Sequence, residues 1–265
     1  ADVSHADGLF TVTTSAGTYR APNLVIATGG PAIPKLGATG FAYSLAKQFG
    51  MKIIPPRPAL VPFTLPQGEN LFRELAGVAA EVVAKAGKTA FREAALFTHK
   101  GLSGPAMLQV SSYWRHGEAI AVDFLPDAVP GWLTEMKRQR PKAGLKSVLA
   151  SLLPERLAIA LADTLALPGE LGAQKDASLT AAMQRLKAWS FRPDGTEGFA
   201  KAEVTAGGID TAGLSSRSMM ANHIEGLFAI GEAVDVTGWL GGYNFQWAWA
   251  SGHAAGQAIA ERGRG

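Results

Sequence analysis

A glycine-rich segment, Leu227–Gly256, constrains the fold more than any other part of the chain. It opens with four apolar residues, Leu227–Ile230, which have the length and composition of a buried strand. A loop rich in glycine follows, and a helical pattern begins near Asn244. Small residues then recur at every fourth position: Ala248, Gly252, Gly256 and Ala260. This spacing predicts one small helix face that lies against a sheet, and the helix N-terminus offers free N–H groups to a phosphate or a polar ring edge.

The position of Glu232 distinguishes this loop from an ordinary glycine turn. Glycine turns are common in α/β folds and indicate no function by themselves. Glu232 follows the predicted strand directly, at the carboxyl end where open α/β sheets bind ligands. A carboxylate at that place accepts hydrogen bonds from ribose or ribityl hydroxyls. We therefore expect Glu232 to face a bound ligand.

The composition excludes several classes of protein. The 265 residues allow one large domain or two small ones, and the formal net charge of +3 does not argue for a nucleic-acid or membrane partner. The chain has no cysteine, which excludes disulfides, thiolate metal sites and cysteine nucleophiles and fits a reducing compartment such as the cytoplasm. The five histidines have no spacing typical of a metal site, and we expect none. No apolar stretch is long enough to cross a bilayer.

The order of patterns along the chain predicts a discontinuous domain. A second apolar run, Asn23–Thr28, ends at Gly29-Gly30, in the same way that the later strand ends at Gly231-Glu232. Three prolines, Pro55, Pro56 and Pro58, predict a rigid connector and a domain boundary. Strands are then expected at Leu60–Leu65, Gly77–Ala84, Lys88–Glu93 and Ala119–Phe124, and helices at Trp132–Arg140, Gly144–Leu152, Pro154–Leu165 and Ser178–Trp189.

We therefore predict an α/β fold that is α+β overall. Residues 1–57 and 200–265 would form a discontinuous Rossmann-like domain. Residues 58–199 would form an inserted domain, β-barrel-like and then helical, that covers the substrate.

Five motifs along the chain resemble the HI0933-like (BaiN-type) flavoproteins. They recur in the family's order: Ala27–Gly30 with Gly37–Gly40, Arg57–Pro62, Phe97–Ala106, Thr205–Gly208, and Gly231–Glu232 with Gly241–Asn244. The resemblance implies a FAD-binding domain, FAD as cofactor, and oxidation or reduction of a small organic molecule. It implies cofactor contacts from Thr28, Gly29, Gly30, Gly207, Gly208, Gly231, Glu232, Gly241, Gly242, Tyr243, Asn244 and Phe245.

One part of the family pattern is missing from these residues. Such families begin with a strand, a G-x-G-x-x-G turn and a helix that hold the FAD pyrophosphate, and no G-x-G-x-x-G occurs in this chain. We therefore expect this chain to be a fragment of a longer protein, with a truncated FAD-binding domain that lacks the N-terminal segment of the same protein. That missing segment is an expected partner, and we expect weak FAD binding by the chain alone.

Three functions stay open at this point. The main hypothesis is a FAD-dependent oxidoreductase with a small-molecule substrate, NAD(P)H as a candidate electron donor and no nucleic-acid partner. The first alternative is an RNA-associated flavoprotein of the tRNA-modifying kind, suggested by the basic helical block, and the second is a non-catalytic remnant of the fold. His99, in a polar loop, is a weak candidate for a proton donor beside a flavin, and a loop histidine that binds backbone is the favoured alternative.

Overall fold

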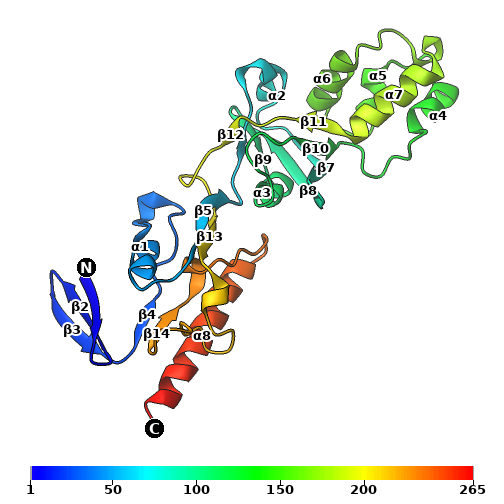
Figure 1. Cartoon of the computed structure of the whole chain (residues 1–265). Coiled ribbons are helices and arrows are strands. Elements are labelled where there is room, and N and C mark those ends of the chain that lie inside the picture. The colour runs from blue at the N-terminus through cyan, green and yellow to red at the C-terminus, as the bar shows by residue number, and fades with distance from the viewer. Residues whose placement is uncertain (1, 265) are drawn as a thin grey trace. The chain divides into compact units, whose positions relative to one another are not determined.

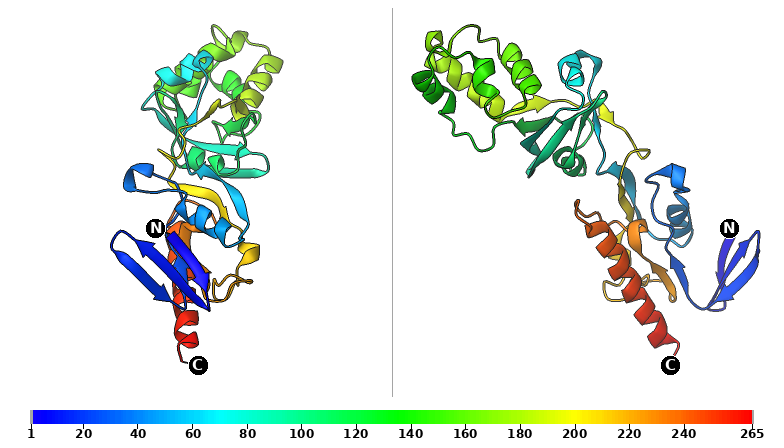
Figure 2. Two further views of the ribbon diagram at one scale, coloured as in Figure 1. Left: turned by 60° about the vertical axis from the view of Figure 1, so that its left-hand side comes forward. Right: turned by 180° about the vertical axis from the view of Figure 1, so that it is seen from behind.

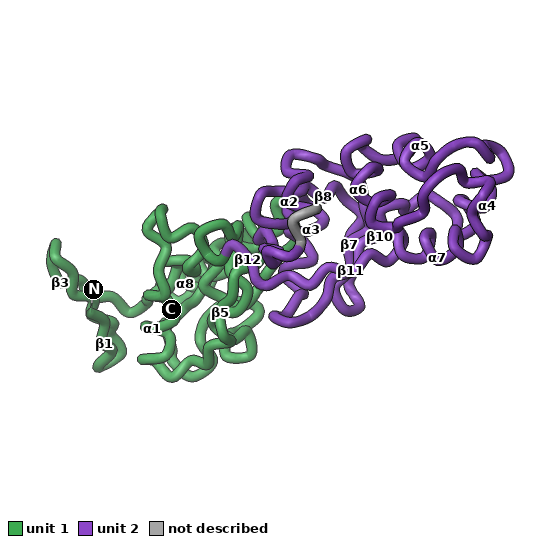
Figure 3. The backbone as a smooth tube through the Cα atoms, turned by 90° about the horizontal axis from the view of Figure 1, so that it is seen from above, with its two compact units in different colours: residues 1–59, 198–265 green, residues 60–197 purple. Residues whose placement is uncertain are grey.

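The computed structural model describes residues 2–264, and the side chains at positions 69–71 lie outside the described part. The chain divides into two compact units, residues 1–59 with 198–265, and residues 60–197 (Figure 3). Within the described residues, no helix is both long and apolar enough to cross a membrane.

The first unit is built around a parallel strand pair. β4 (Leu24–Ile26) and β14 (Leu227–Ala229) run parallel, with Leu24 opposite Leu227 (Figure 1). Both strands are short and apolar, and β14 is fully buried. The two apolar runs predicted from the sequence therefore form neighbouring strands, although 203 residue numbers separate them in the chain.

Other elements of the first unit complete its core. An antiparallel meander precedes the parallel pair and consists of β1 (Asp2–Ala6), β2 (Leu9–Thr14) and β3 (Gly17–Ala21). A short helix, α1 (Phe41–Gln48), follows β4. Phe10, Ile26 and Phe228 are among the largest fully buried side chains of this core. Burial of such side chains stabilises the unit by about 1.5–3 kcal/mol each.

The proline-rich stretch is an extended strand of the first unit, so the prediction of a connector was wrong, and the division between the two units falls directly after it, at Ala59. β5 (Ile53–Ala59) contains all three prolines and pairs antiparallel with β13 (Val204–Ile209). The register shifts between Ala206 and Gly208, so that two residues of β5, Pro55 and Pro56, form a bulge opposite Gly207. A bulge and an edge position tolerate proline because neither requires its missing N–H.

The C-terminal helix packs only in part with the face that the sequence predicts. α8 (Tyr243–Arg262) lies along β14 (Figure 2). Trp247 Nε1 donates to the carbonyl of Gly231 at 3.0 Å, and Ser251 Oγ accepts the Gly231 N–H at 3.0 Å. These two bonds set the rotation of the helix and bury Ser251, while Gly256 is exposed. The predicted small-residue face is therefore only half-buried at its start and exposed at its end.

The second unit contains an antiparallel sheet in the order β11-β10-β7-β8-β9-β6-β12. The strands are β6 (Phe63–Thr64), β7 (Ala79–Ala86), β8 (Thr89–Phe97), β9 (Gly101–Ser103), β10 (Ile120–Asp123), β11 (Trp189–Phe191) and β12 (Gly195–Thr196). In the described residues this order leaves two edge strands, so the closed barrel expected from the sequence is not confirmed. Helix α3 (Pro105–Ser111) packs on this sheet, and a short helix α2 spans Asn70–Glu74.

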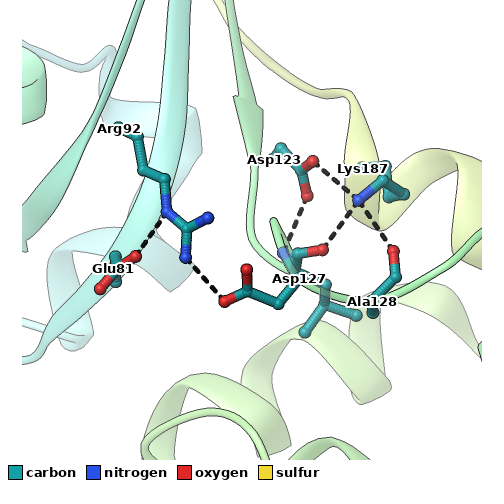
Figure 4. Close-up of polar contacts among 7 residues, drawn as sticks. Glu81, Arg92, Asp123, Asp127, Ala128 and Lys187 are labelled. Carbon is teal, nitrogen blue, oxygen red and sulfur yellow. Dashed lines mark hydrogen bonds and ion pairs between the residues drawn. The ribbon is translucent and has the colours of Figure 1, made fainter.

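The helical part of the second unit follows β10. It consists of α4 (Trp132–Gln139), α5 (Leu145–Leu149), α6 (Glu155–Leu165) and α7 (Asp176–Lys187). A short 3-10 helix, Leu171–Ala173, lies between α6 and α7, and the other 3-10 helices of the described residues span Pro34–Leu36, Gln67–Glu69, Thr211–Gly213 and Gly231–Ala233. Lys187, at the end of α7, pairs with Asp123 of β10 at 2.9 Å and donates to two loop carbonyls, which ties the helices to the sheet (Figure 4).

Candidate functional site

Glu232 joins the end of β14 to β13. It lies in the 3-10 turn directly after β14, and its Oε1 accepts the backbone N–H of Thr205 at 2.7 Å. The side chain is held by this bond in a half-buried position. A carboxylate has about four acceptor positions, so one protein bond leaves capacity for a ligand hydroxyl.

Two buried hydroxyls lie beside this carboxylate. The Tyr43 hydroxyl from α1 and Oγ1 of Thr205 are buried and have no hydrogen-bond partner within the described residues. Both lie next to Gly30, where an added Cβ would come within 2.7 Å of Thr205 Oγ1 and 2.8 Å of the Tyr43 hydroxyl. A buried polar group without a partner costs about 1–3 kcal/mol, so this cluster is a place where a ligand's polar atoms would be accepted.

The environment of Tyr43 keeps its hydroxyl protonated. Burial raises the pKa of Tyr43 to about 12, and the negative charges of Glu232 and Asp235 add to the rise, while the nearby Thr205 hydroxyl lowers it in part. At neutral pH the side chain is therefore a neutral hydrogen-bond donor. This donor and the Glu232 acceptor lie close enough to influence one another.

The glycine loop before α8 is closed by Asn244. Its Oδ1 accepts the Gly238 N–H at 2.8 Å, and its Nδ2 donates to the Gly238 carbonyl at 3.2 Å. Gly241 and Gly242 have φ of 107° and 93°, which glycine adopts at little cost. Gly242 begins α8 without a side-chain cap, so the first N–H groups of the helix, from Tyr243 onward, have no helical carbonyl to bind.

Aromatic side chains flank this helix start. Tyr243 and Phe245 are 58% and 68% exposed. Phe245 also lies 6.2 Å from the ring of Trp249, which is 69% exposed. The side chains of Tyr243 and Phe245, which we predicted to contact the cofactor, are therefore exposed to solvent in this chain.

The β13 glycines serve the packing of the first unit. The Gly207 N–H donates to Asp235 Oδ1 at 3.0 Å, and both glycines are buried. An added Cβ on Gly208 would overlap the carbonyl of Ala233. Gly207 and Gly208 therefore allow backbones to approach closely, and the Asp235 carboxylate accepts a backbone N–H of strand β13.

Apart from the two β13 glycines, the predicted cofactor residues fall into three groups. Gly30, Gly231 and Glu232 follow the carboxyl ends of β4 and β14. The pairing of these two strands continues one bond further, because the Ile230 N–H donates to the Ile26 carbonyl at 3.1 Å. Thr28 and Gly29 follow β4 on the same side, with Thr28 exposed. The residues from Gly241 to Phe245 form the glycine loop and helix start.

His99 belongs to the second unit. It is exposed in the tight turn between β8 and β9, where the Thr98 N–H donates to the Gly101 carbonyl at 2.8 Å. Its proposed role as a proton donor stays a prediction.

Sequence reasoning missed Tyr43 and the side chain of Thr205. Thr205 opens the Thr205–Gly208 motif, which drew attention only through its glycines. Tyr43 lies on a short helix with an ordinary apolar face, and only the tertiary contact with Gly30 gives it significance.

The fold and the site define a class of protein. A parallel strand pair with a glycine turn and a carboxylate at its carboxyl ends, next to a glycine-initiated helix, is typical of Rossmann-like α/β domains. The family model of the HI0933-like protein Rossmann domain matches residues 1–258, and the chain belongs to this family. The resemblance found in the motifs is confirmed at this level.

Three curated relatives are similar to most of the chain. It is 48% identical over 262 residues to the ribosomal RNA dihydrouridine synthase of Escherichia coli (strain K12), covering 94% of this chain and 64% of that protein. The protein of the same name from Haemophilus influenzae is 42% identical over 248 residues, covering 92% and 62%. The 3-dehydro-bile acid delta(4,6)-reductase of Clostridium scindens is 31% identical over 261 residues, covering 92% and 63%. The chain therefore spans a little under two thirds of the length of these relatives.

These relatives correct two expectations. We expected a small organic substrate and no nucleic-acid partner, and both expectations were wrong, because the two relatives at 42–48% identity are named for their action on ribosomal RNA. The finding favours the RNA-associated alternative instead.

Proposed function

We propose that the protein is a flavin-dependent enzyme that reduces uridine in ribosomal RNA to dihydrouridine. The observation that supports this best is the identity of 48% and 42% to two ribosomal RNA dihydrouridine synthases over more than nine tenths of the chain. The reaction adds a hydride and a proton across one carbon–carbon double bond of the base. NAD(P)H is the proposed source of the electrons.

The first unit would hold FAD. Glu232 would accept hydrogen bonds from its ribose or ribityl hydroxyls, and the backbone around Gly30, where the missing Cβ makes room for the hydroxyls of Tyr43 and Thr205, would pass close to it. The unpaired hydroxyls of Tyr43 and Thr205 fit a ligand with polar atoms at this place. When bound, the flavin supplies the hydride.

The helix start at Gly242 would stabilise negative charge on the cofactor. Free N–H groups at a helix N-terminus favour an anion, whether a phosphate or a reduced flavin. The Asn244 bonds to Gly238 would keep the loop in the shape that presents these groups. We also propose Thr28, Gly29, Gly231 and Gly241 as neighbours of the cofactor, from their places in the two loops.

The second unit would recognise the substrate. It contains the basic helical block, and RNA affinity rests largely on Lys and Arg contacts with phosphates. This assigns the cofactor to residues 1–59 and 198–265 and the RNA to residues 60–197.

A reconstituted reaction tests the proposal. Purified protein with FAD and NADPH is incubated with unmodified ribosomal RNA, with unmodified tRNA or with free uridine, and the digested nucleosides are measured by mass spectrometry. We expect dihydrouridine in the ribosomal RNA sample alone. Product in tRNA alone would favour the tRNA-modifying alternative, and absence of product with NADPH consumption would contradict the proposed substrate.

A further inference from the structure

We propose that the turn between α4 and α5, together with the start of α7, binds the phosphate backbone of RNA. The surface consists of Arg140, Lys142 and Lys175 and is called the basic turn below. The inference rests on the proposed function, because an RNA substrate must be held by some cationic surface of the protein.

The sequence concentrates positive charge at this place. Residues 130–189 contain nine Lys or Arg and five Asp or Glu, whereas the whole chain contains 25 and 22. Within Lys137–Lys146 there are five cations and no carboxylate. The net charge of the whole chain is small, but the helical block carries a local excess of positive charge.

Backbone hydrogen bonds bring the members of the basic turn together. The Gly172 N–H donates to the Pro141 carbonyl at 2.8 Å, and the Leu171 N–H donates to the Ala143 carbonyl at 2.8 Å. Lys137 Nζ reaches the carbonyl of Gln174, also at 2.8 Å. The segment that contains Arg140 and Lys142 is thus fastened beside the segment that ends at Lys175.

The cations of the basic turn are not neutralised within the protein. All three side chains belong to exposed residues, and none forms an ion pair in the part of the chain that the structure describes. Arg140 donates only a long bond of 3.4 Å to the hydroxyl of Ser147. Exposed cations without a carboxylate partner are free to displace the counterions of a nucleic acid.

Other cations of the second unit have structural partners. Arg92 bonds Glu81 and Asp127, each at 2.7 Å, and Lys187 bonds Asp123 and two carbonyls (Figure 4). Arg156 donates to the carbonyls of Glu74 and Ala76. Basic residue content alone therefore does not define the surface, and the gathering of unpaired cations at one turn does.

A hollow adjoins the basic turn. It has a volume of about 610 Å³ and is lined by residues 144–147 and 166–169 with Ala162 and Asp163. Lys146 and Asp163 form an ion pair of 2.7 Å at its lining. A concave surface beside unpaired cations suits a single-stranded RNA segment, whose phosphates bind the cations while a sugar or base enters the hollow.

Binding of RNA as a function of salt tests the assignment. A fluorescent single-stranded fragment of ribosomal RNA is titrated with the full chain, with R140Q/K142Q/K175Q, and with the matched control R20Q/K85Q/K88Q. The control removes the same charge from exposed residues outside the helical block. Circular dichroism melting confirms that each variant is folded.

We expect the basic-turn variant to bind at least tenfold more weakly at low salt. The slope of log K against log salt should become shallower by about 2, since each single-strand phosphate contact contributes roughly 0.7. The control should keep both the affinity and the slope of the unchanged chain. Equal RNA binding by both variants would contradict the assignment of the basic turn and leave the proposed function intact. Absence of RNA binding by the unchanged chain would contradict both the assignment and the proposed function.

Discussion

Glu232 accepts the backbone N–H of Thr205 at 2.7 Å, and this bond ties the carboxyl end of β14 to β13. The same threonine places its buried side-chain hydroxyl, without a partner in the described residues, beside Gly30 and the hydroxyl of Tyr43. One residue of β13 thus orients the carboxylate with its backbone and contributes a polar group with its side chain. The candidate cofactor site depends on this arrangement.

Glu232→Ala should weaken FAD binding by roughly 1.5–3 kcal/mol, because it removes a charged hydrogen-bond acceptor. Glu232→Gln should lose less, since an amide oxygen still accepts the Thr205 N–H and a ligand hydroxyl. Quenching of flavin fluorescence during a titration measures the FAD affinity of both variants. Glu261→Ala, at the exposed C-terminal end of α8, is the matched control. Equal affinities for all four proteins would remove Glu232 from the site.

Gly242→Val should reduce flavin content and destabilise the start of α8. The structure shows open space around an added Cβ but a φ of 93°, so the expected penalty comes from backbone strain of about 1–2 kcal/mol. Gly242→Asn should be milder, because asparagine enters this region more readily. Gly256→Ala on the same helix should keep its flavin and gain slightly in stability. The measurements are flavin absorbance per chain and the melting temperature, and a Val variant that matches Gly256→Ala in both would contradict the placement.

The raised pKa of Tyr43 predicts a loss of stability in alkali. Its pKa is about 12 in the folded chain against a usual 10, so the folded state retains a proton that the unfolded state has lost between these pH values. The stabilisation is present below pH 10 and disappears as the pH rises towards 12, to the extent of roughly 2 kcal/mol. Urea unfolding of the chain and of Tyr43→Phe over this range isolates the effect. Parallel pH profiles of the two proteins would show that Tyr43 is not responsible.

His99→Asn should lower dihydrouridine formation if the imidazole donates the proton of the reduction. General acid catalysis contributes about 10²–10⁴-fold, so the loss should be at least tenfold. The rate of flavin reduction by NADPH should stay unchanged, because that step needs no proton from His99. If both rates are unchanged, His99 is a surface residue of the turn after β8.

Local sequence signals predicted the elements of this fold more successfully than their contacts. The apolar runs before Gly29 and Gly231 and the helix after Gly242 are confirmed as β4, β14 and α8. The buried face of α8 was predicted only in part, since the rotation of the helix depends on the bonds of Trp247 and Ser251 with a residue many positions away. A pattern of small residues does not contain this information.

In the candidate site, too, the residues identified by local sequence signals were predicted and those identified by tertiary contacts were not. Glu232 could be proposed because its position after a strand is a local property. Tyr43 could not be proposed from the sequence, because its place in the site depends on tertiary contacts with Gly30 and Thr205. The substrate was predicted wrongly for a physical reason, namely that a net charge of +3 averages over the helical block and the rest of the chain.

Mapping of dihydrouridine in cellular ribosomal RNA tests the central claim most directly. Ribosomal RNA and tRNA are purified from cells with the gene intact, deleted, or replaced by the Glu232→Ala form, and dihydrouridine is quantified by mass spectrometry. The account predicts that deletion removes dihydrouridine from the ribosomal RNA, leaves that of tRNA unchanged, and is not fully reversed by the Glu232→Ala form. Unchanged dihydrouridine in the ribosomal RNA of the deletion strain would contradict it.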